Sequence, residues 1–303
     1  MNIIKRGAVV CMSLMVAAGV VVAGGPLQVA AVPPVQPRHD VIGLQQDGTL
    51  YRYENHGGMA PLRGTGERFG DNMSHYPLLQ FADLDGDGRA EVIAYPKLHN
   101  AKVYRSSDRW GVQTDYRKAL ESDIPYRGGV STFAKLSYHG ATQEVYVDNG
   151  KLYAAPVFHT SDKDGRERFE LGQARQIGHG WGDFTSLMAG DITGDGLDDI
   201  VGVKKDHSLW LYETDGAYWA GKTSVFKAGV RIGTGWHIFD TIMIGDINGD
   251  GRADAVGRLH NGTLRYYVNT GNAAWPFGAG SRQIGSGFNR FKAIYLAEVV
   301  KDK

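Results

Sequence analysis

The stretch DITGDGLDDIVG at Asp191–Gly202 decides the fold, because a close copy, DINGDGRADAVG, recurs at Asp246–Gly257. A third copy, DLDGDGRAEVIA, occupies Asp83–Ala94. The interval from Asp83 to Asp191 is close to twice the interval from Asp191 to Asp246, so a degenerate copy is expected between them. Residues 144–153, EVYVDNGKLY, supply the matching strand–turn–strand text. Self-similarity at such a period is typical of repeat architectures.

Alignment of the strand that follows each Asp-rich loop predicts five repeats. The anchor residues, which are almost evenly spaced, are Asp40, Glu91, Glu144, Asp199 and Asp254. We expect each repeat to contain four strands. The inner strand precedes the loop, the second follows it, the third follows a two-residue turn, and the fourth lies outermost. Asp-Gly and Asn-Gly favour such hairpin turns because they tolerate positive φ. Four strands in about 53 residues is the size of a propeller blade.

The two ends of the repeat region complement each other. Residues 40–70 supply the last three strands of a repeat, whereas residues 291–296 supply a first strand with nothing after it. Joined, they make a complete blade and remove exposed sheet edges. The sequence therefore predicts an all-β, five-bladed β-propeller over residues 40–303, with four strands per blade and the C-terminal strand closing the ring in the N-terminal blade. An open repeat array or a β-sandwich is the alternative.

The N-terminal residues have the pattern of a secretory signal peptide. Basic residues 5–6 precede an apolar run over residues 7–24, and Ala31 ends a small-residue cleavage site. We therefore expect residues 1–31 to be removed, residues 32–39 to form a Pro-rich leader, and the mature protein to be secreted without a membrane span. A retained anchor is the alternative, although the run is at the short limit for a span. The single cysteine, Cys11, would be lost with the signal peptide.

Composition and motifs argue against several classes of function. The 33 basic and 33 acidic residues balance, whereas a nucleic-acid binder would need a surplus of Lys and Arg. The sequence contains no GxSxG elbow, HExxH pair or phosphate-binding loop. A paired-carboxylate acid–base site needs no motif, so a glycan-active enzyme stays a less favoured alternative. We expect a protein that is not an enzyme.

Oxygen donors recur at positions 1, 3, 5 and 9 of each Asp-rich loop, and the carbonyl of position 7 can point inward. Glycines at positions 4 and 6 allow a tight wrap. Six to eight oxygens in a flexible loop suit Ca²⁺ better than Mg²⁺. The pattern differs from an EF-hand because it ends at position 9 and continues into a strand. We predict about three Ca²⁺ sites, formed by Asp83, Asp85, Asp87, Arg89 and Glu91, by Asp191, Thr193, Asp195, Leu197 and Asp199, and by Asp246, Asn248, Asp250, Arg252 and Asp254.

The loops are expected to differ in strength. Thr193 replaces a charged donor and should weaken its site. In the degenerate copy anchored at Glu144, Leu136 would be position 1 and Gly140 position 5. That blade is expected to bind no metal.

Two resemblances follow from these motifs. The DxDGDGxxD loop with its apolar strand and DGxL hairpin resembles the FG-GAP/VCBS repeats of secreted bacterial and integrin-type propellers. The IGxGWxxF segments at Ile177, Ile232 and Ile284 resemble those of tachylectin-type five-bladed lectins. Together they cover nearly all of the mature chain. They imply a Ca²⁺-stabilised extracellular propeller that binds glycans or proteins and is not usually catalytic. The chain departs from a lectin in its metal loops, and from integrins in its five repeats.

Aromatic residues recur inside the second motif. Trp181, Trp236 and Phe288 stand at equivalent positions and would form a ring of aromatics on one face, where they could stack on sugars. We therefore predict lectin-like carbohydrate binding, with packing between blades as the alternative role of these side chains. A protein-binding or scaffold propeller in a secreted assembly is the second functional prediction. The partner would be a glycan or an extracellular protein, and the protein a monomer or part of a larger assembly.

Overall fold

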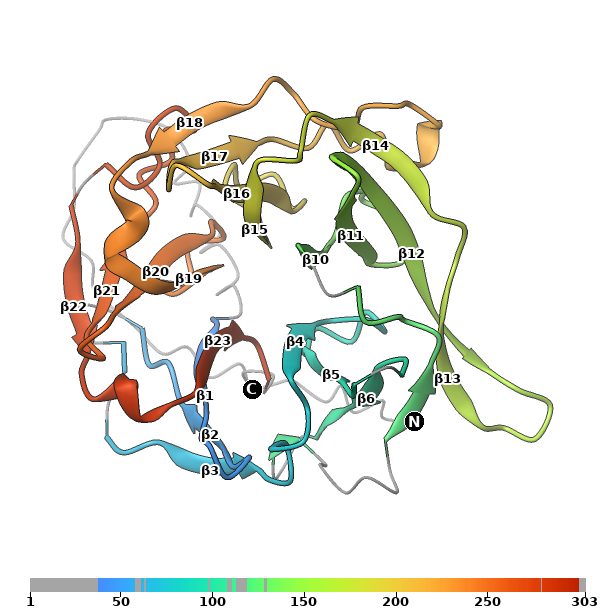
Figure 1. The fold of residues 1–303 in the computed structure, drawn as a ribbon, viewed down its shortest axis with the longest axis horizontal. Helices are drawn as coiled ribbons and strands as arrows, with labels where there is room; N and C mark the ends of the chain where they lie inside the picture. Colours follow the sequence, from blue (N-terminus) through green and yellow to red (C-terminus); the bar gives the residue numbers. More distant parts are fainter. Residues whose placement is uncertain are drawn as a thin grey trace, which may run out of the picture. The chain divides into compact units, whose positions relative to one another are not determined.

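Five sets of strands surround a common centre, and each set is one blade of a β-propeller (Figure 1). The computed structural model describes residues 38–57, 61–62, 64–97, 99–107, 111–112, 119–127, 130–278 and 280–299. All of them fall within one compact unit of the chain, residues 35–303. The predicted signal peptide and most of the predicted leader lie outside the described residues. The predicted five-bladed propeller is confirmed.

Each blade is an antiparallel sheet in which neighbouring strands pair in order from the centre of the ring outward. Blade 1 consists of β23 (Ala293–Ala297), β1 (Asp40–Leu44), β2 (Leu50–Tyr53) and β3 (Glu67–Gly70). Blade 2 consists of β4 (Leu78–Ala82), β5 (Glu91–Tyr95), β6 (Lys102–Tyr104) and β9 (Leu120–Ser122). Blade 3 consists of β10 (Ser131–Ala134), β11 (Gln143–Asp148), β12 (Lys151–Ser161) and β14 (Arg175–His179). Blade 4 consists of β15 (Phe184–Gly190), β16 (Asp199–Lys204), β17 (Leu209–Tyr212) and β18 (Val230–Gly233). Blade 5 consists of β19 (Phe239–Gly245), β20 (Asp254–Leu259), β21 (Leu264–Tyr267) and β22 (Arg282–Gly285).

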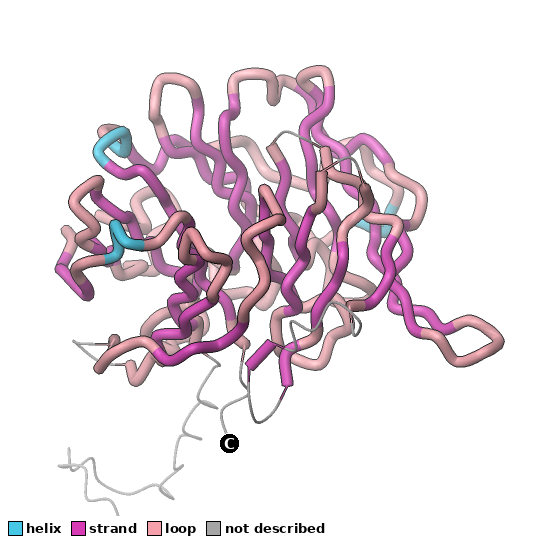
Figure 2. The backbone as a smooth tube through the Cα atoms, turned by 60° about the horizontal axis from the view of Figure 1, so that its bottom comes forward, coloured by secondary structure: helices cyan, strands magenta, loops and turns pink. Residues whose placement is uncertain are grey.

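Helical structure is confined to short turns in the part of the chain that the structure describes. The 3₁₀ turns are η2 (Tyr218–Ala220), η3 (Trp236–Ile238) and η4 (Phe288–Arg290), while strands and loops make up the rest (Figure 2). No helix among these residues has the length and apolar character that a bilayer span requires.

The second strand of each blade is buried along most of its length, because its blade packs against a neighbour on either side. In β1 and β5 every residue is buried. The third strands β17 and β21 instead alternate between buried and half-buried positions. Short continuous apolar runs and strict alternation are the two patterns expected for strands buried on both faces and on one face.

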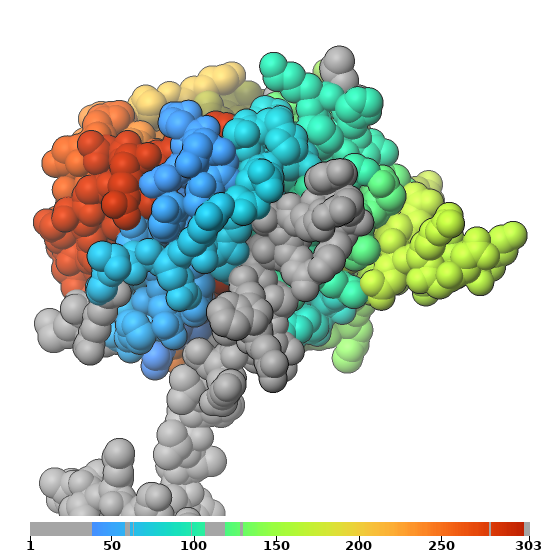
Figure 3. Space-filling view, turned by 90° about the horizontal axis from the view of Figure 1, so that it is seen from below, coloured from blue at the N-terminus to red at the C-terminus, as the bar shows by residue number. Residues whose placement is uncertain are grey.

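The ring closes where the sequence predicts. β23 pairs antiparallel with β1, from Asp40 opposite Ala297 to Leu44 opposite Ala293. The same kind of pairing joins the inner and second strands of the other blades. In the space-filling view of Figure 3, red surface from the last part of the described chain borders blue surface from its first part.

Five apolar clusters form the core, and each lies on the seam between two neighbouring blades. The seam between blades 5 and 1 is filled like the others, with Val41 and Tyr53 packed against Val256 and Tyr266. Each blade therefore buries both of its faces against neighbours, which is how a sheet with two apolar faces becomes stable.

Blades 2 and 3 depart from the predicted separation into independent sheets. β12 runs past the end of its blade, pairing first with β11 as far as Pro156 and then, from Val157, with β13 (Glu167–Leu171). β13 in turn pairs in parallel with β9 of blade 2, so the two blades share one sheet. Proline cannot donate a ladder hydrogen bond, which suits its place at the change of partner. A two-stranded sheet of β7 (Ser106–Ser107) and β8 (Gly111–Val112) accompanies blade 2.

Candidate metal centres

The three Asp-rich loops lie at one end of the strands, on the same face of the ring. They are residues 83–90, 191–198 and 246–253, and each joins the inner strand of its blade to the second strand. We call this side of the ring the loop face. In each blade the residue before the loop pairs with position 9, as Gly190 pairs with Asp199.

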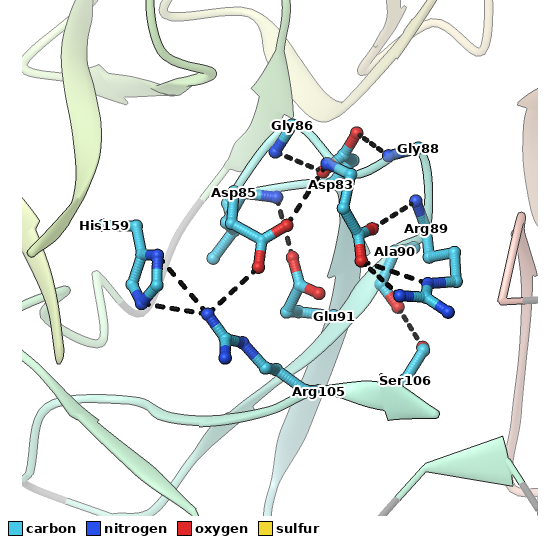
Figure 4. Close-up of polar contacts among 12 residues, drawn as sticks. Asp83, Asp85, Gly86, Gly88, Arg89, Ala90, Glu91, Arg105, Ser106 and His159 are labelled. Atoms are coloured by element: carbon cyan, nitrogen blue, oxygen red, sulfur yellow. Dashed lines mark hydrogen bonds and ion pairs between the residues drawn. The ribbon is translucent and has the colours of Figure 1, made fainter. Parts of the chain in front are cut away.

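The first acid of each loop holds the curled backbone. Asp83 accepts hydrogen bonds from the N–H groups of Gly86 and Gly88, at 2.7 and 2.9 Å (Figure 4). Asp191 and Asp246 accept the equivalent pairs of glycine N–H bonds. The glycines at positions 4 and 6 all have φ between 78° and 87°. Glycine enters this region without a steric penalty. Burial raises the pKa of all three first acids.

The acidic residue at position 9 of each loop is buried and fixes the loop backbone through hydrogen bonds. Glu91, Asp199 and Asp254 are at most 1% exposed. Each accepts the backbone N–H of position 2, at 2.8 to 3.1 Å. Asp199 and Asp254 also accept an N–H from the residue 15 positions later, Thr214 or Asn269. Burial raises the pKa of Glu91 to about 8, of Asp199 to about 7 and of Asp254 to about 6. These carboxylates therefore have a structural role that needs no metal.

The first loop comes nearest to a formed cation site. Oxygens of Asp83, Asp85 and Glu91 all lie within 4.8 Å of one another. Asp87 is not in this group, and its two oxygens accept hydrogen bonds from the backbone and guanidinium of Arg89. Three of the four predicted side-chain donors are thus brought together.

The second and third loops are less convergent. Among the described residues, no other trio of acidic, His or Cys side chains meets the same distance criterion. Position 3 is Thr193 or Asn248 in these loops, and position 9 is an aspartate, one methylene shorter than Glu91. The buried hydroxyl of Thr193 has no hydrogen-bond partner. An orphaned oxygen on the curl of the loop, together with carboxylates at positions 1 and 5, is a donor set that fits a hard cation such as Ca²⁺.

The loops also link each blade to the one before it, which the sequence did not predict. In each of the five blades, the residue at position 8 donates a hydrogen bond to the backbone carbonyl of position 1 in the preceding blade. The pairs are His39 N to Asp246 O at 2.8 Å, Ala90 N to Glu298 O at 2.6 Å, Thr142 Oγ1 to Asp83 O at 2.7 Å, Asp198 N to Lys135 O at 2.9 Å, and Ala253 N to Asp191 O at 2.6 Å. We call these five bonds the seam bonds.

In the degenerate loop of blade 3, the structure places positions 1 and 9 one residue earlier than the sequence predicts. Ala134 pairs with Gln143, so Gln143 and not Glu144 is position 9, and Lys135 and not Leu136 is position 1. Leu136 donates its N–H to Oε1 of Gln143, the bond that position 2 makes to the ninth acid elsewhere. With Lys and Gln in place of two acids, this loop lacks the charge that a cation site requires.

The three aromatics proposed to bind sugars are buried. Trp181, Trp236 and Phe288 are 3, 7 and 4% exposed. A Cβ on Gly178, Gly233 or Gly285 would lie 2.3 to 2.7 Å from the ring of its own motif, so each ring covers the glycine of the IGxGW segment. These positions favour the packing alternative over an exposed aromatic face.

Comparison with known proteins identifies the repeat to which two of the loops belong. Residues 191–257, which span the second and third loops and the strands between them, match the family model of the FG-GAP-like repeat. A comparison with curated proteins gave no match. The chain is therefore a five-bladed β-propeller that contains an FG-GAP-like repeat, in a fold that typically serves binding or scaffolding.

The structural role of the ninth acid is tested by Asp199→Ala in buffer containing EDTA. The change leaves the N–H groups of Ile192, Thr193 and Thr214 without their acceptor. A buried unsatisfied group costs about 1–3 kcal/mol, so we expect the free energy of unfolding, measured by urea denaturation, to fall by at least about 3 kcal/mol. Asp183→Ala, at an exposed site, is the matched control. Equal stability of the two variants would contradict this role.

Proposed function

We propose that the protein is a secreted, Ca²⁺-stabilised propeller that binds carbohydrate without acting as an enzyme. The signal-like N-terminus supports secretion, and the donor sets of the Asp-rich loops support Ca²⁺. The observation that carries carbohydrate binding is a pocket of about 310 Å³ at the seam between blades 4 and 5. It lies on the face of the ring opposite the loop face.

The lining of the pocket combines an aromatic wall with polar groups. Trp236 and Phe239 supply the wall, and His207, His237 and Asp240 supply donors and acceptors. Asp240 is held in place by a 2.6 Å bond from Nε of Arg258. Ligand sites typically pair apolar walls with a few fixed polar groups, and a pyranose ring offers a C–H face to the first and hydroxyls to the second. Trp236 thus keeps a part in the proposed site although most of its surface is buried.

His207 stands where three other blades have glycine. It has φ 61°, while Gly48, Gly150 and Gly262 occupy the same turn position with φ between 73° and 87°. The left-handed conformation costs a residue with a Cβ about 1–2 kcal/mol. Strained residues of this kind cluster at functional sites, which favours a role for His207 beyond the turn itself.

The glycine-containing turns are closed by a hydrogen bond that is missing beside His207. Met73, Trp181 and Phe288 donate their N–H groups to the glycine carbonyls at 2.9 to 3.0 Å. Among the described backbone hydrogen bonds, none joins Trp236 to His207. At Gly48 and Gly262 an added Cβ would lie 2.2 or 2.3 Å from a backbone nitrogen of the next loop. At Gly150 the nearest atom would be 3.7 Å away, so a side chain at this turn position needs a junction wider than those of blades 1 and 5.

His207→Gly tests the pocket. Glycine relieves the strained φ and restores the turn of the other blades, so we expect the melting temperature to stay the same or rise. Retention on a glycan array should fall at least about tenfold, the loss expected for about 1.4 kcal/mol. His179→Ala, an exposed histidine beside the blade 3 motif, is the matched control. Unchanged glycan retention by His207→Gly would contradict this site.

Removal of Ca²⁺ tests the loops. A cation bound to the folded state at a hundredfold excess over Kd adds about 2.7 kcal/mol per site, which is about 5–10 °C for a domain of this size. We expect EDTA to lower the melting temperature by several degrees, and Ca²⁺ at a hundredfold excess over Kd to restore it. An unchanged melting temperature would contradict Ca²⁺ stabilisation. It would not affect the proposed glycan pocket, which the His207→Gly variant tests separately.

A protein-binding or scaffold role is the second candidate. Tyr138, Trp219 and Trp275 are 58, 52 and 56% exposed on the loop face. The Trp219 indole is fixed by a 2.8 Å bond to the carbonyl of His139. Exposed Trp and Tyr side chains are the residues that most often anchor protein partners. A blank glycan array together with a stable partner that is lost in Trp219→Ala would favour this function.

A further inference from the structure

We propose that Arg105 is a built-in counter-ion of the first Asp-rich loop, which a divalent cation displaces toward the β12–β13 hairpin. Cation binding in this loop and the position of the hairpin would then be linked. This inference rests on the proposed Ca²⁺ binding.

Arg105 lies between the loop and the hairpin and contacts both. It follows β6 directly, and its Nη2 is 3.2 Å from Oδ2 of Asp85. Nη1 is 2.9 Å from Oε2 of Glu167, and Nη2 is 2.9 Å from Nε2 of His159. Figure 4 shows the guanidinium between Asp85 and His159.

Asp85 is where the two positive charges would compete. It belongs to the group of three acids within 4.8 Å, and its side chain is 11% exposed, so the carboxylate is poorly screened by water. A divalent cation and a guanidinium a few ångströms apart repel each other strongly in such surroundings. The cation would therefore weaken the contact between Arg105 and Asp85.

The hairpin offers partners to which the Arg105 guanidinium can move when it leaves Asp85. Glu167 and His159 stand on the two strands of the hairpin and already contact the guanidinium. The buried Nε of Arg105 has no hydrogen-bond partner, so the guanidinium does not use all of its donors in its present position. A shift toward Glu167 keeps an ion pair while it leaves Asp85 to the cation.

A shift of Arg105 should change how firmly the β12–β13 hairpin is held against blade 2. β12 and β13 project from the ring (Figure 2), and the tip between them is exposed. β13 is attached to blade 2 through two paired residues of β9. Arg105 adds a side-chain tether at this attachment, so its strength should affect how often the hairpin opens.

Linkage is reciprocal, so Arg105 should weaken cation binding by the free energy with which the cation displaces it. Arg105→Gln should therefore bind Ca²⁺ about tenfold more tightly at one class of site, within the 5–150-fold range typical of coupled sites. Glu167→Gln, which removes the second partner and leaves Arg105 to Asp85, should bind Ca²⁺ a few-fold more weakly. Arg168→Gln, a hairpin arginine paired with Glu170, is the matched control and should not change affinity.

The test is calorimetric titration of the full chain with Ca²⁺, together with trypsin cleavage at Lys163 and Arg166 in the exposed tip. In the wild type, Ca²⁺ should slow this cleavage because Arg105 then holds Glu167 and His159 more firmly. In Arg105→Gln the cleavage rate should no longer depend on Ca²⁺.

Each other result overturns the inference. Ca²⁺ binding that is the same in Arg105→Gln and Arg168→Gln would refute it and leave the proposed Ca²⁺ role intact. Weaker binding in Arg105→Gln would mean that Arg105 positions Asp85 for the cation and does not compete with it. A wild type that binds no Ca²⁺ would refute the inference and the proposed Ca²⁺ role together.

Discussion

The five seam bonds are the constraint on which the rest of the structure depends. Each joins position 8 of one blade to the position 1 carbonyl of the blade before it, and together they run once around the ring. The apolar clusters lie between blades, so they stay dry only while neighbouring blades keep this register. In the closed ring every blade has both apolar faces covered by neighbours, whereas an opened ring would expose one apolar face of each of two blades.

The same short loop therefore has two tasks that share its acids. The ninth acid accepts backbone N–H groups inside the blade and is needed with or without a cation. The first and third positions stand nearer the surface and have oxygens to offer a metal. Blade 3 separates the two tasks: Gln143 keeps the hydrogen bond of position 9, while Lys135 replaces the charge of position 1. A divalent ion would thus reinforce loops that already hold the ring together.

The repeat spacing predicted the number of blades and the closure of the ring, because Asp and Gly recur wherever the chain must curl back into a strand. The prediction of Glu144 as position 9 is wrong by one residue, because a copy without Asp at position 1 leaves the start of its loop undefined in the alignment. Sequence alone does not say whether Trp181 faces water or covers Gly178; the contact appears only in three dimensions. His207 is absent from the predicted site residues, although the sequence contains a signal for it, because three other blades have Gly at this turn position. The shared sheet of blades 2 and 3 depends on a long-range pairing of β13 with β9 that no local pattern encodes.

Hydrogen exchange of the amides that make the seam bonds tests the central claim most directly. His39 and Ala90 flank the blade that closes the ring, whereas Asp198 and Ala253 lie on seams within the continuous chain. If the five seams are equivalent, all four amides exchange only through global unfolding and have the same protection in Ca²⁺-free buffer. Rapid exchange at His39 and Ala90, with Asp198 and Ala253 still protected, would show that the ring opens at blade 1 and would contradict the account.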